Sequence, residues 1–236
     1  LSVKAAIEKF AAQDHAPLQP GDVIILNDPF SGGSHLPDIT LVSPIFIHAA
    51  NQQASQPADQ PTNNYKLQIT HPFSPTPTPP VLIGFAANRA HHADVGGMSP
   101  GSMPIAREII QEGLIIPPVK LVEAGKLNQA VWEMILANVR TPAARAGDLH
   151  AQLAANQRGV TRMQELVARY GPDEVQRYSH ALLAYTERLT RALLRDLPDG
   201  NYTFTDTLDD DGLGHTDIPI TVRLTISGDA ATVEIV

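Results

Sequence analysis

The sequence predicts an α+β protein with a mixed sheet, then a long helical hairpin, then the start of a C-terminal β region. Apolar runs of strand length alternate with glycine-rich turns over residues 1–140. Apolar residues then recur at helical spacing over residues 141–197. Over residues 198–236 the pattern changes to period two, which is typical of strands. We therefore expect these three regions, with polar turns at the strand ends of the first.

The first region opens with a short amphipathic helix, expected over Val3–Gln13. The continuous apolar run Val23–Leu26 predicts a strand that is buried on both faces. A second strand is expected over Ile39–Ile47, where Pro44 indicates a sheet edge or a bulge. The third strand is expected over Val81–Ala87. These strands carry the polar turns considered below.

Residues 50–79 differ in kind from the strands on either side. Proline, glutamine and asparagine dominate this segment, and few of its residues could join a core. Such a composition cannot bury enough apolar area to offset the entropy lost on ordering. We therefore interpret residues 50–79 as an insertion between two strands.

The second region is predicted to contain two long helices. Thr141 and Pro142 supply a capping residue and a first-turn proline, and the sequence Gly171-Pro172 separates the helices. Their apolar stripes are interpreted as core or as the seam of an oligomer. The stripe residues are Leu149, Leu153, Val160, Met163 and Val167 in the first helix, and Val175, Tyr178, Leu182, Tyr185, Leu189 and Leu193 in the second.

Two glycine-containing segments, residues 27–38 and 89–97, hold the side chains that suggest chemistry. Each follows a predicted strand, and its glycines permit close backbone approach. Histidine nitrogens and aspartate oxygens together are a usual ligand set for divalent metals. The alternative is that the histidines are hydrogen-bonded loop residues and the aspartates cap turns. The candidates are His35, His91, His92, Asp28, Asp38 and Asp94.

A further helix is expected from Pro104 to Glu112, ending at Gly113. Its free N–H groups would open near the proposed metal site and favour an anionic group. Alternatively, Ser102 simply caps this helix.

These segments resemble the signatures of the hydantoinase B/5-oxoprolinase family. That family includes the B subunit of ATP-dependent hydantoinases, the C-terminal half of 5-oxoprolinase and the α subunit of acetone carboxylase. The resemblance covers about residues 18–172 in six ordered blocks, which is far more specific than any one motif. The blocks are residues 27–38, 89–97, 101–104, 112–114, 147–152 and 154–159.

The resemblance implies that His35, Asp38 and His91 bind a divalent ion, which would be zinc, manganese or iron. His92 and Asp94 are expected to be further ligands, or groups that orient the imidazoles.

The resemblance also suggests two catalytic carboxylates. Asp28 would orient a ligand or act as a base, or else it caps its own turn. Asp148 is a site candidate through the resemblance alone. It could equally form a surface pair with Arg145, three residues earlier on a helix.

The implied function is the ATP-dependent opening of a cyclic amide, with 5-oxoproline to glutamate as the first choice. Alternatives are the B subunit of an N-methylhydantoinase or of another lactamase, and an acetone-carboxylase-like subunit. From another class, the chain could be a metal-bound structural or subunit-docking module. The sequence holds no Gly-x-x-x-x-Gly-Lys-Ser/Thr phosphate cradle. ATP and magnesium are therefore expected in a hydantoinase A-like partner half.

Composition limits the remaining classes. The net charge of −8, without a basic run, argues against a nucleic-acid surface. There is no cysteine, which excludes disulfides and fits a reducing compartment. No apolar run approaches the roughly 20 residues that span a bilayer. We expect a cytoplasmic, oligomeric protein, and this chain looks like an excised piece of it.

Overall fold

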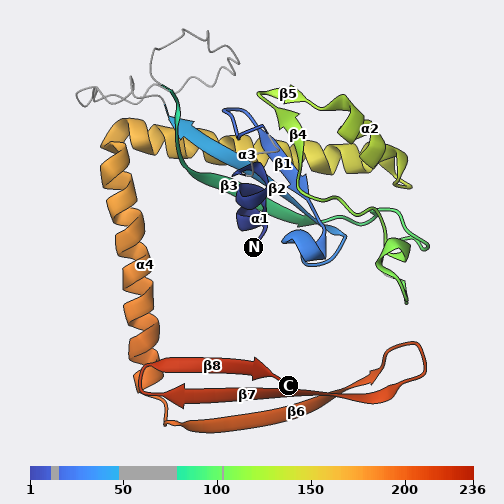
Figure 1. Cartoon of the computed structure of the whole chain (residues 1–236), viewed down its shortest axis with the longest axis vertical. Helices are drawn as coiled ribbons and strands as arrows, with labels where there is room; N and C mark the ends of the chain where they lie inside the picture. The colour runs from blue at the N-terminus through green and yellow to red at the C-terminus, as the bar shows by residue number, and fades with distance from the viewer. Residues whose placement is uncertain (12–15, 48–78, 103) are drawn as a thin grey trace. The chain divides into compact units, whose positions relative to one another are not determined.

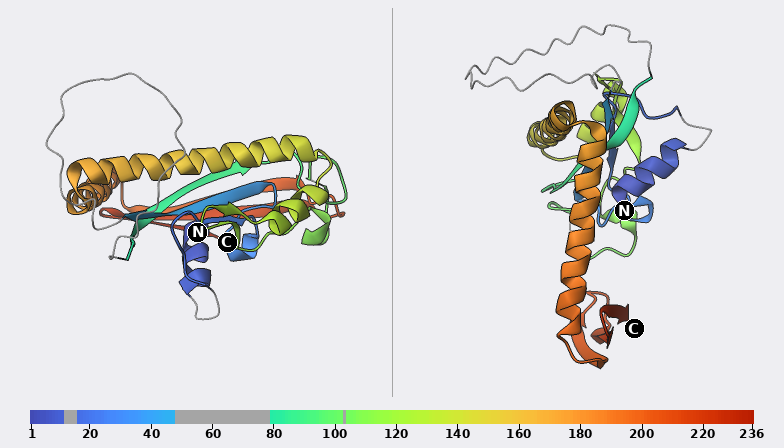
Figure 2. Two further views of the ribbon diagram at one scale, coloured as in Figure 1. Left: turned by 90° about the horizontal axis from the view of Figure 1, so that it is seen from above. Right: turned by 90° about the vertical axis from the view of Figure 1, so that its left-hand side faces the viewer.

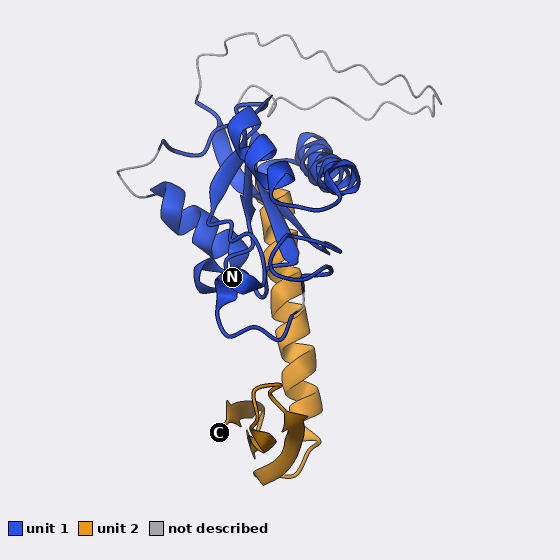
Figure 3. Ribbon diagram, turned by 90° about the vertical axis from the view of Figure 1, so that its right-hand side faces the viewer, with its two compact units in different colours: residues 1–172 blue, residues 173–236 orange. Residues whose placement is uncertain are grey.

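A computed structural model describes residues 1–11, 16–47, 79–102 and 104–236 (Figure 1). The predicted insertion at residues 50–79 falls almost wholly outside this part of the chain. The insertion therefore stays a prediction. The division of the chain into residues 1–140, 141–197 and 198–236 also stays a prediction. The chain separates into two compact units, Leu1–Pro172 and Asp173–Val236 (Figure 3), and each is described by itself.

The first unit is built on a five-stranded sheet with the order β3-β2-β1-β4-β5. Its strands are β1 (Val23–Leu26), β2 (Asp38–Ile47), β3 (Val81–His91), β4 (Val119–Glu123) and β5 (Lys126–Leu127). All of these pairings are antiparallel, so the expectation of a mixed sheet was wrong. The short connection between β1 and β2 accounts for the antiparallel pairing of those two strands, since parallel neighbours require a long crossover.

Helices cover both faces of the central strand β1. These are α1 (Ser2–Ala11), α2 (Gln129–Ala137) and α3 (Pro142–Tyr170), and α3 runs along β2 and β3 (Figures 1 and 2). Ile24 is fully buried in a cluster with Phe10 of α1. Ile25 is buried on the opposite face with Trp132 of α2 and Leu149 of α3. The prediction that this strand is buried on both faces is confirmed.

The sheet is irregular close to Pro44, as this proline led us to expect. Within the described pairings β1 reaches only as far as Val42, so β3 is the one partner of β2 at Pro44. The β2–β3 register then shifts between Ile45 and Phe46. A proline costs little here, because the sheet has no hydrogen bond to lose on the β1 side.

The helix predicted from Pro104 to Glu112 is not formed. One turn of 3-10 helix, η3 (Ile109–Gln111), replaces it. The side chain of Gln111 accepts hydrogen bonds from the N–H groups of Arg107 (2.7 Å) and Glu108 (3.1 Å), which satisfies the backbone locally. Ser102 caps no helix. The expected anion site therefore does not exist among these described residues, because there is no α-helix N-terminus to form it.

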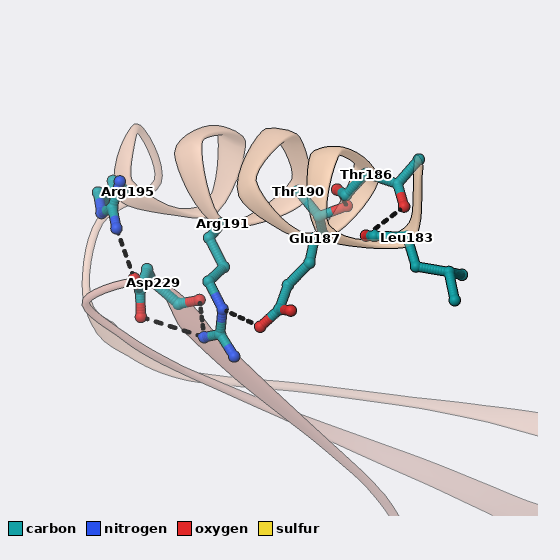
Figure 4. A network of polar contacts seen from close by, with 7 residues as sticks. All are labelled: Leu183, Thr186, Glu187, Thr190, Arg191, Arg195 and Asp229. Atoms are coloured by element: carbon teal, nitrogen blue, oxygen red, sulfur yellow. Dashed lines mark hydrogen bonds and ion pairs between the residues drawn. The ribbon is translucent and has the colours of Figure 1, made fainter. Parts of the chain in front are cut away.

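The second unit joins α4 (Pro172–Arg195), apart from its first residue, to a three-stranded antiparallel sheet. The strands are β6 (Gly200–Asp210), β7 (Thr216–Ser227) and β8 (Ala230–Ile235). Ser227 pairs with Ala230, so a tight turn joins β7 to β8. Asp229 in that turn forms ion pairs with Arg191 (3.3 Å) and Arg195 (2.6 Å) of α4 (Figure 4).

The α+β class is confirmed, with α3 and α4 as the two long consecutive helices of the predicted hairpin. The apolar stripe of α4 is not core among the described residues, because no residue of α4 is buried. Leu182, for example, is 64% exposed. An oligomer seam stays a prediction. Across the described residues, no helix has both the length and the apolar character needed to cross a membrane.

Candidate metal centre

The pairing of β2 with β3 creates the candidate centre. Asp38 is the first residue of β2 and His91 the last residue of β3, and the register makes them direct partners. Side chains of such cross-strand partners lie on the same face of the sheet, within contact distance. Two segments 53 residues apart in the sequence are thereby brought to one point.

His35 completes the group from the loop before β2. The N–H of Asp38 donates to the carbonyl of His35 (3.0 Å), and this turn brings the two side chains together. Nε2 of His35 lies 3.1 Å from Oδ1 of Asp38, and Nδ1 of His91 lies 3.2 Å from the same oxygen. The two imidazole rings have centroids 5.1 Å apart. One ligand atom from each residue lies within 4.8 Å of the others.

These residues fit a divalent ion. Metal–nitrogen bonds of about 2.0–2.1 Å at a tetrahedral angle place ligand atoms about 3.4 Å apart. The observed separations of 3.1 and 3.2 Å are close to that value. The side chains of His35 and His91 are 41% and 50% exposed, so the group is open to solvent in this chain. Three protein ligands at an accessible site leave coordination positions open for chemistry.

Asp38 is held in its charged form. Partial burial raises the pKa of its carboxyl, but the hydrogen bond from Ser34 and the neighbouring His35 and His91 outweigh burial and lower the pKa overall. The hydroxyl of Ser34 donates to Oδ2 of Asp38 (2.8 Å), which leaves Oδ1 to face the histidines. An ionised carboxylate is the form that binds a metal.

His92 lies on the opposite face of β3 from His91, because successive side chains of an extended chain alternate. It is 1% exposed, and its Nε2 is 2.9 Å from Oε1 of Gln152 on α3. Burial lowers the pKa of His92, more than the Gln152 hydrogen bond raises it. Gln152 in turn donates to the carbonyl of Ile39 (2.9 Å). The structure therefore does not bring His92 to the centre, and instead shows it tying the sheet to α3.

Asp94 also lies away from the centre. Its Oδ2 accepts the backbone N–H of Arg140 (2.6 Å), and its Oδ1 pairs with the Arg140 guanidinium (2.7 Å). Burial raises the pKa of Asp94, but the backbone and side-chain donors of Arg140 outweigh burial and lower it overall. Asp94 thus joins the end of the second signature segment to the start of α3.

This pair predicts an acid-sensitive contribution to stability. A carboxyl whose pKa is lowered in the folded state stabilises the protein above the unfolded pKa, near 3.8, and loses that effect as the pH falls through the folded value. Asp94→Asn should therefore be less stable than wild type at pH 7, by about 1–3 kcal/mol. The difference should shrink as the pH falls below about 4.

Denaturant titrations at pH 7 and pH 3 would measure both differences. Arg140→Met should reduce the pH dependence only in part, because it removes the guanidinium but keeps the backbone N–H that donates to Oδ2 of Asp94. A constant difference between wild type and Asp94→Asn at both pH values would contradict the assignment.

The two predicted catalytic carboxylates are both engaged locally. Asp28 caps the 3-10 turn η1 (Pro29–Ser31), where it accepts the N–H of Phe30 (2.9 Å) and the hydroxyl of Ser31 (2.6 Å). This is the turn-capping alternative. Asp148 is half-exposed on α3 and pairs with Arg145 (2.8 Å), which is the surface-pair alternative. Neither side chain belongs to the three-residue group of ligand atoms.

Sequence reasoning missed the residues that support the centre. Asn27 is fully buried and binds the backbone of two other segments. Arg89 contacts Ser34, whose hydroxyl holds Asp38. A signal for Arg89 was present, since it stands two residues before His91 and so shares its face of the strand. Gly33 allows the close approach expected of it, because any side chain there would overlap the backbone oxygen of Asn27.

Comparisons with known proteins agree on one family. A family model described as hydantoinase B/oxoprolinase matches residues 1–235. The B subunit of a putative D-/L-hydantoinase from Pseudomonas sp. (strain NS671) is 34% identical over 91% of this chain and 32% of its own length. A 5-oxoprolinase from Dictyostelium discoideum is 32% identical over 77% of this chain and 12% of its own length.

A solved structure matches nearly the whole fold. The crystal structure of an ATP-dependent caprolactamase from Pseudomonas jessenii has a TM-score of 0.78 and 34% identity. The match covers 99% of this chain and 34% of that one. The chain therefore spans about a third or less of the proteins that it matches.

Proposed function

Because the chain belongs to the hydantoinase B/oxoprolinase family, we propose that it forms the metal-binding part of an ATP-dependent enzyme that opens a cyclic amide. The observation that carries this proposal is the convergence of His35, Asp38 and His91 on one accessible point. The relatives support the reaction class, since they are named as a hydantoinase subunit, a 5-oxoprolinase and an ATP-dependent caprolactamase.

The first-choice substrate is 5-oxoproline, which would open to glutamate. A lactam carbonyl is a poor electrophile, and phosphorylation of its oxygen by ATP would activate the ring carbon. Water would add to that carbon, and the ring C–N bond would break as the nitrogen takes up a proton, which leaves an acyl phosphate. A second water would hydrolyse the acyl phosphate to the carboxylate and free phosphate. This division of labour assigns the phosphorylation to an ATP-binding partner half or subunit. Hydantoins and caprolactam are the alternative rings, because the related enzymes are named for them.

In this chain, His35 and His91 would hold the ion through their ring nitrogens, and Asp38 through its carboxylate. A divalent ion at this position supplies charge that polarises a substrate oxygen and lowers the pKa of water. Ser34 keeps the Asp38 carboxylate ionised and turned toward the histidines. The exposed side chains of both histidines leave the approach to the site open on the protein side.

The proposal predicts that the 236-residue chain on its own does not hydrolyse ATP or 5-oxoproline. The reason is that its sequence lacks a Gly-x-x-x-x-Gly-Lys-Ser/Thr phosphate cradle and so needs the partner half for activation. Phosphate release by the pure chain, with and without 5-oxoproline, would measure this. ATP turnover by the chain alone would contradict the division of labour.

The function itself is tested with the complete enzyme, which combines this chain with its ATP-binding half. Ring opening of 5-oxoproline, hydantoin and caprolactam is followed with ATP, after metal removal and after restoring zinc, manganese or iron. We expect turnover of one ring class, loss of ring opening on metal removal, and recovery with one of the ions. Full ring opening by the metal-free enzyme would instead favour a structural or docking role for this chain.

A further inference from the structure

Arg89 lies beside the candidate centre in an unusually well-defined position. It stands on β3 two residues before His91, and its guanidinium is held by three hydroxyl groups. Nε donates to Thr40 (2.9 Å), one terminal nitrogen to Ser34 (3.1 Å) and the other to Ser2 (2.9 Å). These partners come from β2, the loop before it and α1, so three separate elements fix one side chain.

The partners of Arg89 are all neutral. Among the described residues no carboxylate pairs with it, although seven other arginines there do pair with acids. Those seven are Arg140, Arg145, Arg162, Arg177, Arg191, Arg195 and Arg223. The three hydrogen bonds hold the charge of Arg89 in place. Because Arg89 is exposed, that charge is also open to solvent.

The guanidinium also keeps donors available. Arginine carries five N–H groups, and the three hydrogen bonds of Arg89 use one on each nitrogen. One N–H on each terminal nitrogen is therefore free of the described residues. A pair of N–H groups on one planar guanidinium matches two oxygens of a carboxylate or phosphoryl group.

The position of Ser34 shows how near this charge is to the centre. Its hydroxyl accepts from Arg89 and donates to Asp38 (2.8 Å), so a single side chain separates the guanidinium from a proposed metal ligand. A divalent ion and one carboxylate leave a net positive charge, and Arg89 adds a second. An anionic group is the complement of that local charge.

We propose that Arg89 binds an oxyanion of the substrate, a phosphoryl or carboxylate group, beside the candidate metal centre. This inference rests on the proposed function and deepens it. Two sources carry the same chemistry: the phosphoryl group of an activated amide, and a carboxylate of the substrate or of the ring-opened product. In either case Arg89 would hold the anionic group while the carbonyl carbon lies at the metal centre.

The test separates anion binding from metal binding. Inorganic phosphate and acetate are titrated into the chain by calorimetry, with and without saturating Mn²⁺, and Mn²⁺ binding is measured by electron paramagnetic resonance. The variants are Arg89→Met, which removes the charge, and Ser34→Ala, which removes the link to Asp38. Arg188→Met removes the same charge from an exposed position on α4 and is the matched control.

We expect Arg89→Met to weaken binding of at least one anion by about tenfold or more, and to leave Mn²⁺ binding within about threefold. Ser34→Ala should do the reverse, weakening Mn²⁺ binding while anion binding persists at saturating metal. Arg188→Met should match wild type in both titrations. Stronger binding of phosphate than of acetate would identify the phosphoryl source, and the opposite order the carboxylate source.

Three results would overturn the inference: no anion binding by the wild type, unchanged anion binding in Arg89→Met, or equal loss of metal and anion in that variant. The last result would mean that Arg89 only orients Asp38. Failure of the proposed function looks different. The wild type would then bind no metal, while anion binding that depends on Arg89 would persist without Mn²⁺.

Discussion

Replacing His35, Asp38 or His91 singly with alanine is expected to remove both the bound divalent ion and the ring-opening activity of the complete enzyme. Each side chain supplies one of three ligand atoms gathered at one point. Losing a group that merely orients a ligand typically costs 10–100-fold in metal affinity, so losing a ligand should cost at least about 100-fold. Activity should fall in parallel, because the open coordination positions disappear with the ion.

Folding should be nearly unaffected in the two histidine variants. The side chains of His35 and His91 are 41% and 50% exposed and bury little apolar area. Exposed substitutions of this kind usually change stability by about 0.5 kcal/mol or less. Metal content by mass spectrometry, turnover and thermal melting would be measured on the same preparations.

His215→Ala provides a matched control. His215 is an exposed histidine that pairs with an aspartate, Asp211, at 2.6 Å, but it lies in the second unit without a third ligand among the described residues. It should keep full metal content and activity. A fully active His35→Ala enzyme with unchanged metal content would refute the assignment of the centre.

Replacing Asn27 with alanine is expected to give the largest loss of stability. Its side chain is completely buried at the end of β1. Nδ2 donates to the carbonyls of Leu36 (2.8 Å) and Leu114 (2.9 Å), and Oδ1 accepts from the N–H of Ile116 (2.7 Å). The substitution would leave these three backbone groups without their side-chain partner; the bonds of two of them are buried, and that of the Leu114 carbonyl is partly buried. Each such group costs about 1–3 kcal/mol, so a total on the order of 3 kcal/mol is expected.

For a protein of this size, that loss corresponds to a melting temperature lower by roughly 6–12 °C. Asn27→Asp tests the same interpretation, because a carboxylate has the shape of the amide but cannot donate to the two carbonyls. It should be at least as unstable as Asn27→Ala. The exposed Asn138, whose side chain bonds only the carbonyl of Met134 (2.7 Å) among the described residues, should tolerate alanine with little change. An unaltered melting temperature for Asn27→Ala would show that the hydrogen bonds are dispensable.

Asn27 also explains why the loop within residues 27–38 has a defined shape. Its contact with the Leu36 carbonyl closes the loop that carries His35 and Ser34. Loosening this contact should therefore weaken metal binding as well as stability. In the His35 and His91 variants, by contrast, metal binding and activity should fall while stability is kept, so the two sets of variants distinguish support of the site from participation in it.

Several features were determined by the sequence alone, because their causes are local. The apolar run of β1 forms a strand, and Pro142 begins α3 after Thr141. The spacing of His35 and Asp38 places both side chains on one turn, so their proximity follows from neighbouring backbone. In these cases a few adjacent residues contain the whole physical reason.

The failed predictions have causes that lie elsewhere in the chain. The sequence from Pro104 to Glu112 predicts a helix that Ser102 could cap. The hydroxyl of Ser102 instead accepts the N–H of Val95 (2.8 Å) and donates to the carbonyl of Gly96 (2.7 Å). The side chain of Gln111 then accepts the N–H groups of Arg107 and Glu108, which in a helix would bond the carbonyls four residues earlier. Helix propensity is a weak preference, and contacts of this kind override it.

Tertiary structure alone decided which histidine joins the centre. His91 and His92 are adjacent, and only the family resemblance ranked His91 first, whereas a strand sends consecutive side chains to opposite faces. The β2–β3 register sets Asp38 opposite His91, and His92 turns inward to Gln152 on α3. A shift of one residue would exchange the two histidines. That register depends on packing between distant segments, which the spacing of residues along the chain does not encode.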